Sequence, residues 1–188
     1  MIRLIAGLGN PGSKYKETRH NAGFLFADCF ATAMHGSWQE KKSFKADIAT
    51  LPGGDSALLK PATFMNLSGD AVGAYARYYK ISPDEILVAH DELDLDAGTV
   101  RLKTGGGHGG HNGLRDIISK LGSRDFHRLR IGIGHPGSSH EVLNYVLGKP
   151  SLDDRISILS AVERTVGYAT ELLNGDFQPI MNQLHSRA

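Results

Sequence analysis

The chain has 188 residues, of which 40% are hydrophobic and 22% are charged, a balance that is ordinary for a soluble globular protein. Its single cysteine, Cys29, excludes an internal disulfide framework, and the short apolar run after Arg3 is too brief for a secretory signal or a membrane span. This length suffices for one sizeable core, so we expect residues 1–188 to form a single domain of a cytoplasmic protein without membrane contact.

Strand and helix patterns alternate along the chain. Short apolar or alternating runs predict strands over residues 2–7, 44–51, 56–60, 86–89, 98–104 and 128–134. Helical spacing of apolar residues predicts helices over residues 21–36, 67–80, 112–122 and 152–175. Because the turn Pro52-Gly53-Gly54 joins two of the strands directly, we expect an α/β fold with a twisted mixed β-sheet flanked by helices.

Gly7, Gly9 and Gly12 spell G-x-G-x-x-G after the first predicted strand, which is the pattern of a dinucleotide-binding turn. Such a turn must lead directly into a helix, because the backbone N–H groups of the turn and of the helix N-terminus bind the phosphates. Here Pro11 lacks one of these N–H groups, and the stretch that follows has no apolar helical face. A triphosphate-binding loop would need lysine where Ser13 stands. We therefore interpret this segment as a glycine-hinged loop that displays polar side chains.

Four polar clusters follow strand ends or enter helices, and we expect them to meet at one edge of the sheet. They span residues 9–21, 61–69, 89–95 and 105–113. Their imidazoles and carboxylate can form a general base, and their carboxamides can donate hydrogen bonds to a carbonyl or its oxyanion. No G-x-S-x-G nucleophile is present, so the clusters predict direct attack of water on an acyl bond.

Two other functions stay open from the residues alone. A metal-dependent hydrolase or nuclease would use His108 and His111 with Asp91, although glycine-flanked histidines lack the ligand spacing of a structural zinc site. A non-catalytic RNA-binding module would use the segment from Arg101 to Arg130, where seven Lys or Arg and two Asp give a net charge of +5.

Structural roles would also account for several of these side chains. His20 could be an ordinary surface histidine, and Asp91 could cap a turn after its strand. Asn66 and Asn112 each stand where a helix N-cap is expected, and Tyr15 could pack against the core. The glycines between residues 105 and 110 contribute no core, and either close approach of a ligand or a mobile lid would explain them.

Five motifs resemble those of bacterial peptidyl-tRNA hydrolases. They are GLGNPGSKYKETRHNAG, KPATFMNLSG, VAHDELDL, GGGHGGHNGLRDII and FHRLRIGIGHP. The similarity runs from about residue 3 to YVLGKP at 145–150 and then weakens. It implies a monomeric α/β protein with a mixed central sheet. This protein would hydrolyse the ester joining a peptide to the 3′ ribose of tRNA, without a metal or other cofactor.

The resemblance also implies roles for individual residues. His20 matches the catalytic base of the family, Asp91 matches the partner of that base, and Asn10 matches the asparagine that distinguishes blocked from free aminoacyl ends. The positions that match binding of the peptidyl and 3′-terminal part of the substrate are Tyr15, Phe64, Asn66 and Asn112. Lys103 and Arg130 resemble the clamp for the tRNA 5′ phosphate.

Overall fold

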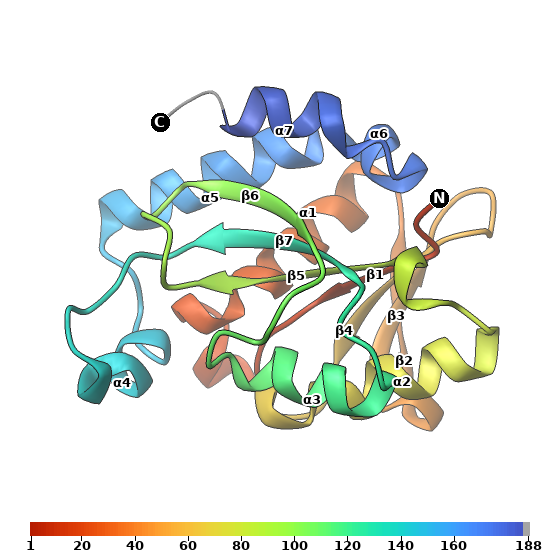
Figure 1. Ribbon diagram of the computed structural model, residues 1–188, viewed down its shortest axis with the longest axis horizontal. Helices are drawn as coiled ribbons and strands as arrows, with labels where there is room; N and C mark the ends of the chain where they lie inside the picture. The colour runs from red at the N-terminus through yellow and green to blue at the C-terminus, as the bar shows by residue number, and fades with distance from the viewer. Residues whose placement is uncertain (186–188) are drawn as a thin grey trace.

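A seven-stranded mixed sheet organises the computed structural model, which describes residues 1–185 (Figure 1). Its strands are β1 (Leu4–Gly7), β2 (Ser37–Lys41), β3 (Ala46–Thr50), β4 (Ala57–Pro61), β5 (Ile86–Glu92), β6 (Val100–Thr104) and β7 (His127–Gly132). The strand order is β2-β3-β4-β1-β5-β7-β6. The central pairs β4–β1, β1–β5 and β5–β7 are parallel, and the outer pairs are antiparallel.

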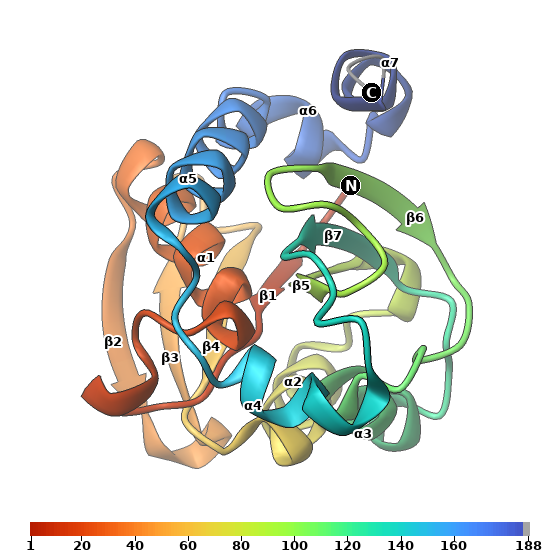
Figure 2. The same ribbon diagram turned by 90° about the vertical axis from the view of Figure 1, so that its left-hand side faces the viewer.

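Helices cover both faces of this sheet. They are α1 (Ala22–Ala33), α2 (Ser68–Tyr79), α3 (Asn112–Leu121), α4 (Val142–Val146), α5 (Leu152–Val166), α6 (Ala169–Asn174) and α7 (Phe177–His185). One core lies under α1 and α5 and includes Phe26 and Phe30, while the other lies under α2 and α3 and includes Val72 and Ile117 (Figure 2). The predicted α/β class, a single domain with a mixed sheet flanked by helices, is therefore confirmed. The extent of this domain over all of residues 1–188 stays a prediction.

The structure differs from the sequence-based elements in several places, and α4 and α7 were not predicted. The helix predicted over 152–175 is divided at Gly167 and Tyr168 into α5 and α6, since glycine favours the helix least among non-proline residues and the chain turns there. The edge strand β2 was missed because its residues are exposed or half-buried, so their polar sequence lacks the apolar alternation of a buried strand. No helix within residues 1–185 combines the length and the apolar character that a bilayer crossing requires.

A close contact between two glycines places the start of α1 against the sheet. A Cβ atom on Gly7 in β1 would lie 2.3 Å from the carbonyl oxygen of Gly23 in α1. A Cβ atom on Gly23 would lie 2.3 Å from the carbonyl oxygen of Ala89 in β5. Because neither residue has a side chain, the turn before α1 comes within reach of the C-terminal end of β5.

Candidate active site

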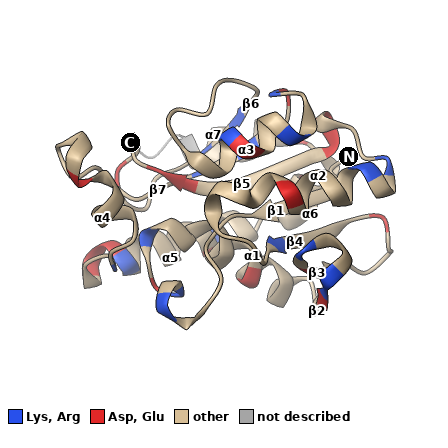
Figure 3. Cartoon of the chain, turned by 90° about the horizontal axis from the view of Figure 1, so that it is seen from below, with Lys and Arg blue, Asp and Glu red and all other residues tan. Residues whose placement is uncertain are grey.

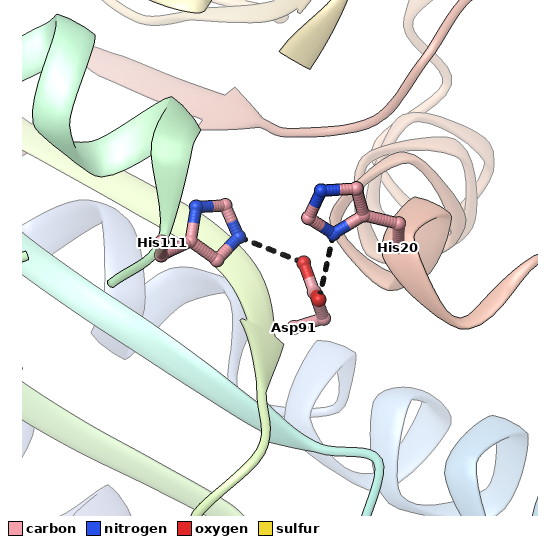
Figure 4. A group of neighbouring side chains, drawn as sticks. All are labelled: His20, Asp91 and His111. Carbon is pink, nitrogen blue, oxygen red and sulfur yellow. Dashed lines mark hydrogen bonds and ion pairs between the residues drawn. The ribbon is translucent and has the colours of Figure 1, made fainter. Parts of the chain in front are cut away.

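Two histidines share one buried carboxylate at the C-terminal end of β5. Asp91 is 3% exposed. Its Oδ2 atom lies 2.8 Å from Nδ1 of His20, and its Oδ1 atom lies 2.8 Å from Nε2 of His111 (Figure 4). Burial alone would raise the pKa of Asp91, but the charge interactions and hydrogen bonds of His111 and His20 outweigh it, so the pKa lies well below its ordinary value. Asp91 is therefore a stable anion between two ring donors.

The hydrogen bonds around the two rings determine their tautomers. Nδ1 of His111 accepts hydrogen bonds from the backbone N–H groups of Gly113 and Leu114, at 3.2 and 3.4 Å. His111 therefore carries its proton on Nε2 and donates it to Asp91. His20 likewise donates from Nδ1, because the carboxylate can only accept. Its other nitrogen, Nε2, points away from Asp91 and retains a lone pair that can take a proton (Figure 4).

Three separate segments supply this network. His20 lies in a short 3-10 turn, Arg19–Asn21, directly before α1, so the glycine contact that seats α1 also seats His20. Asp91 lies near the end of β5, and His111 is the N-cap residue of α3. The predicted pairing of His20 with Asp91 is present, and it joins parts of the chain that are 71 residues apart.

A cavity of about 610 Å³ opens beside these side chains. Five of the residues predicted for the site line it, namely His20, Asp91, Lys103, Asn112 and Arg130. The remaining four, Asn10, Tyr15, Phe64 and Asn66, are not among its lining residues. The glycine-rich segment 107–110 forms one wall of the cavity, and Val142, Leu143 and Val146 of the α4 region form another.

Comparison with known proteins assigns the chain to a family. The family model described as peptidyl-tRNA hydrolase matches residues 4–188. The chain is also 56% identical over 185 residues to the peptidyl-tRNA hydrolase of Coxiella burnetii, with 98% of each chain covered. The chain belongs to the peptidyl-tRNA hydrolase family. It is 51% identical over 188 residues to the Neisseria gonorrhoeae member, covering 99% of this chain and 98% of that one.

A solved structure of this family has the same fold. The crystal structure of peptidyl-tRNA hydrolase from Acinetobacter baumannii superposes with a TM-score of 0.93 at 46% sequence identity, covering 97% of this chain and 94% of that chain. The resemblance inferred from the five motifs is therefore confirmed over nearly the whole chain, beyond the stretch to residue 150 that carried it.

Asn10 is held in one orientation by buried hydrogen bonds. Its side-chain oxygen accepts the backbone N–H of Met65 at 2.7 Å. Its own backbone N–H donates to Oδ1 of Asn21 at 2.8 Å, and Nδ2 of Asn21 donates back to its carbonyl at 2.9 Å. Because the side-chain oxygen is occupied, the amide nitrogen of Asn10 is the group left to donate to a ligand. The sequence did not predict that hydrogen bonds from Asn21 and Met65 would hold Asn10 in this orientation.

Phe64 and Asn66 flank Met65, which donates to Asn10; both are exposed, and Tyr15 beside Phe64 is half-buried. The rings of Tyr15 and Phe64 meet edge to face, with centroids 6.2 Å apart. Phe64 is 56% exposed although it is large and apolar, so it is not part of either core. Asn66 is exposed and does not cap a helix, because Leu67 holds the N-cap position of α2 without a side-chain bond. The structural role considered for Asn66 from the sequence is therefore wrong.

His111 takes part in the hydrogen-bond network of Asp91, in a place that the sequence did not predict. It entered the sequence analysis as one of the imidazoles of the polar clusters and as a candidate metal ligand, and the N-cap of its helix was expected at Asn112. In the structure the His111 ring caps α3, and Asn112 is exposed with its side-chain oxygen accepting from Arg115 at 3.1 Å. Asn112 is therefore free of the capping role and faces the same cavity as His20.

The basic segment divides into cations with different surroundings. Lys103 is exposed, whereas Nε of Arg130 lies 3.0 Å from Oε2 of Glu92, which offsets part of its charge. Because Lys103 pairs with Arg128 and Arg101 with Arg130 in the β6–β7 ladder, all four cations point to the same face of the sheet. Basic residues also occur on α3 (Figure 3).

Arg128 supports the glycine-rich wall of the cavity. It is 3% exposed, and its guanidinium donates to the backbone carbonyls of Gly106 and Gly107. Burial, followed by the neighbouring Arg130, lowers the pKa of Arg128. This half of the loop is therefore anchored to β7.

His90 lies in β5 next to Asp91, and it is buried although it borders the same cavity. It is 1% exposed, and its Nδ1 donates to the backbone carbonyl of Asp91 at 2.7 Å. Burial, followed by the charge of His111, lowers the pKa of His90 to about 3. His90 is therefore neutral at physiological pH and packs beside His111, with ring centroids 5.1 Å apart.

The side chains that could together hold a metal ion differ from those expected from the sequence. Among residues 1–185, candidate ligand atoms of His20, Asp91 and His111 lie within 4.8 Å of one another. His108 is not in this group, and its Nδ1 accepts the backbone N–H of Gly110 at 3.0 Å. Both nitrogens of His111 are used in hydrogen bonds within the protein, and each 2.8 Å separation from Asp91 is a hydrogen-bond length. The geometry therefore favours acid–base chemistry over metal ligation.

Proposed function

We propose that this chain hydrolyses the ester bond between a peptide, or an N-blocked amino acid, and the 3′ ribose of tRNA, with His20 as the general base. Membership of the peptidyl-tRNA hydrolase family supports the substrate. The observation that carries the role of His20 is its 2.8 Å hydrogen bond to Asp91, which leaves Nε2 as a proton acceptor beside a cavity.

The reaction needs a single water molecule and no covalent intermediate. Nε2 of His20 takes a proton from the water as its oxygen attacks the ester carbonyl, and the resulting imidazolium is stabilised by the Asp91 anion. The imidazolium then returns that proton to the departing 3′ oxygen of the ribose, so that a carboxyl group and a free hydroxyl result. His111 donates to the second oxygen of Asp91 and thereby keeps the carboxylate turned toward His20.

Carboxamides select the acyl part of the substrate in this proposal. The amide nitrogen of Asn10 donates to the carbonyl that blocks the α-amine of a peptidyl chain. An unblocked aminoacyl-tRNA presents a charged α-amine there instead, and burying that cation beside another donor is unfavourable. Asn66 and Asn112 donate to the backbone of the acyl group or the 3′ end, and the half-buried Tyr15 ring and the exposed Phe64 ring contact the peptidyl part.

Lys103 and Arg130 bind the 5′ phosphate of the tRNA acceptor end. Both line the cavity that contains His20 and Asp91. Contacts of this kind position the substrate without reading its sequence, and they make the affinity depend on salt. We further propose that the protein acts as a monomer in the cytoplasm.

Hydrolysis of an N-blocked aminoacyl-tRNA, measured with and without a chelator, tests the proposal. We expect full activity in the chelator and a loss of about 10²- to 10⁴-fold in kcat for His20→Ala, the usual contribution of a general base. His140→Ala is the matched control, because His140 is exposed. Full activity of His20→Ala would refute its role as the base, loss with chelator would favour a metal enzyme, and binding of tRNA without turnover would favour an RNA-binding module.

A further inference from the structure

Arg19, the residue before His20, is joined to the segment that follows β7. Its backbone N–H donates to the carbonyl of Gly148 at 3.0 Å, and its Nη1 donates to the carbonyl of Tyr145 at 3.1 Å. Its guanidinium carbon also lies 3.9 Å from the centroid of the Tyr145 ring. Three contacts of different kinds therefore tie the turn that carries His20 to α4 and its C-terminal end.

Tyr145 is itself fixed at its other end. Its hydroxyl donates to the carbonyl of Ile133, the residue after β7, at 2.6 Å. The ring of Tyr145 thus lies between the end of the sheet and the Arg19 guanidinium. Figure 2 shows α4 beside the N-terminal segment that precedes α1. The segment from β7 through α4 consequently forms a strap, defined here as residues 133–148, that connects the end of β7 with the turn of His20.

The strap borders both the catalytic pair and the cavity. Val142, Leu143 and Val146 line the cavity that also contains His20. Asp91 is fixed in the central strand β5, so the hydrogen bond from His20 requires that the turn be held at one place relative to the sheet. The glycine contact holds the α1 side of that turn, and Arg19 holds the side that faces the strap.

We propose that Arg19 and Tyr145 are positioning residues, whose stacked contact keeps the Nδ1 atom of His20 on Asp91. The inference rests on the proposed role of His20 as the base. Neither residue is among those that line the cavity containing His20, so both act on His20 through the turn and the strap. Removal of the contact frees the turn, so that His20 samples orientations in which Nε2 no longer faces the attacking water.

Steady-state hydrolysis of N-blocked aminoacyl-tRNA separates positioning from substrate binding. We expect Arg19→Ala and Tyr145→Leu to lower kcat by about 10- to 100-fold, the range for a misplaced catalytic group, with KM changed by less than about twofold. Tyr145→Phe keeps the ring on the guanidinium and is expected to retain most of kcat. Arg19→Lys keeps the charge but loses the planar stack, so it is expected to resemble Arg19→Ala.

Arg155→Ala is the matched control. Arg155 carries the same charge and contacts the same N-terminal loop, but it does so through Glu17 at 3.1 Å and away from Tyr145. We expect its kcat to be unchanged. A rise in KM with constant kcat in Arg19→Ala would overturn the proposal, because it would mark Arg19 as a substrate contact. An equal loss of kcat in Arg155→Ala would also overturn the proposal, because the loss would then follow from removing a positive charge and not from removing the contact with Tyr145.

A measurement on the free protein keeps the inference separate from the proposed function. The ¹⁵N resonances of the His20 imidazole report which nitrogen carries the proton, and we expect an Nδ1–H tautomer in the native chain that is lost in Arg19→Ala. Unchanged resonances together with unchanged kcat would overturn the positioning role. Full activity of His20→Ala would instead overturn the proposed role of His20 as the base, while leaving the tautomer result in place. Should Arg19→Ala fail to fold, as judged by circular dichroism, Arg19→Lys and Tyr145→Leu give the same comparison.

Discussion

Replacement of Asp91 by asparagine tests the hydrogen-bond network at its centre, because it removes one charge without changing the shape of the side chain. The two backbone N–H groups at the start of α3 hold Nδ1 of His111 as an acceptor, so His111 keeps its proton on Nε2. The oxygen of the introduced carboxamide must then accept from His111, and its NH₂ group must face His20. His20 can accept that hydrogen bond only by moving its proton from Nδ1 to Nε2.

The Asp91→Asn variant therefore holds His20 in the tautomer that cannot act as a base. An imidazole forced into the wrong tautomer in this way loses about 10⁴-fold in kcat in a serine protease triad. Because the carboxylate here also stabilises the imidazolium, we expect a loss of about 10³- to 10⁴-fold, which corresponds to about 4–5.5 kcal/mol in the activation barrier. The protein should fold, since the amide still makes two hydrogen bonds.

Single-turnover hydrolysis of N-blocked aminoacyl-tRNA measures this effect without interference from product release. His20→Ala gives the reference for complete loss of the base, and Asp91→Asn should approach it. A rate within tenfold of the native protein would refute the tautomer reasoning, since it would show that His20 remains a competent base without the carboxylate. The ¹⁵N spectrum of the His20 ring would then be expected to retain the native tautomer.

Four further predictions follow from neighbouring parts of the structure. His111→Ala should lower kcat by less than Asp91→Asn does and should cost about 1 kcal/mol in urea unfolding, because α3 loses its cap. Lys103→Ala should reduce the slope of log affinity for tRNA against log salt by about one, and an unchanged slope would remove Lys103 from the phosphate contact. The depressed pKa of His90, about 3, means that the folded state leaves His90 unprotonated where the unfolded state protonates it. The free energy of unfolding should therefore fall by up to about 1.4 kcal/mol per pH unit as the pH decreases from about 6.5 toward 3. The His90→Asn variant should lack this contribution to the pH dependence of the unfolding free energy. Gly23→Ala should destabilise the fold by at least about 1–3 kcal/mol, as measured by thermal unfolding, because its Cβ would lie 2.3 Å from the Ala89 carbonyl.

The sequence predicted that the polar clusters meet at one edge of the sheet, because the carboxyl ends of parallel strands lie together there. Which imidazole pairs with Asp91 was implied only by the resemblance of the motifs, and the structure places His20 at that position. The role of His111 could not be predicted in the same way. Asparagine is a preferred N-cap and histidine is not, so local preference pointed to Asn112. The ring of His111 takes that position because it bonds the helix N-terminus and Asp91 at once, and only the packing of α3 beside β5 brings these groups together.

The basic segment shows a second limit of sequence analysis. Composition identified an excess of positive charge between Arg101 and Arg130, but it could not distinguish cations that face solvent from those that support the fold. That distinction depends on strand register and on what covers each position. Arg128 lies beneath the glycine-rich loop and binds its carbonyls, whereas Lys103, its partner across the ladder, is exposed. Net charge alone therefore overstates how many of these residues are available to RNA.

Packing and backbone conformation explain the G-x-G-x-x-G pattern without a bound nucleotide. Gly7 and Gly9 lie in packed surroundings, where a Cβ atom would come within 2.3 Å of the Gly23 carbonyl and within 2.6 Å of the Phe24 ring, respectively. Gly12 has open space around it but a φ of +101°, a conformation that side chains disfavour. The first two glycines thus bring α1 close to β1 and β5, and the third lets the loop turn back toward His20. The same spacing that forms a phosphate cradle in other folds serves here to seat a histidine beside a carboxylate.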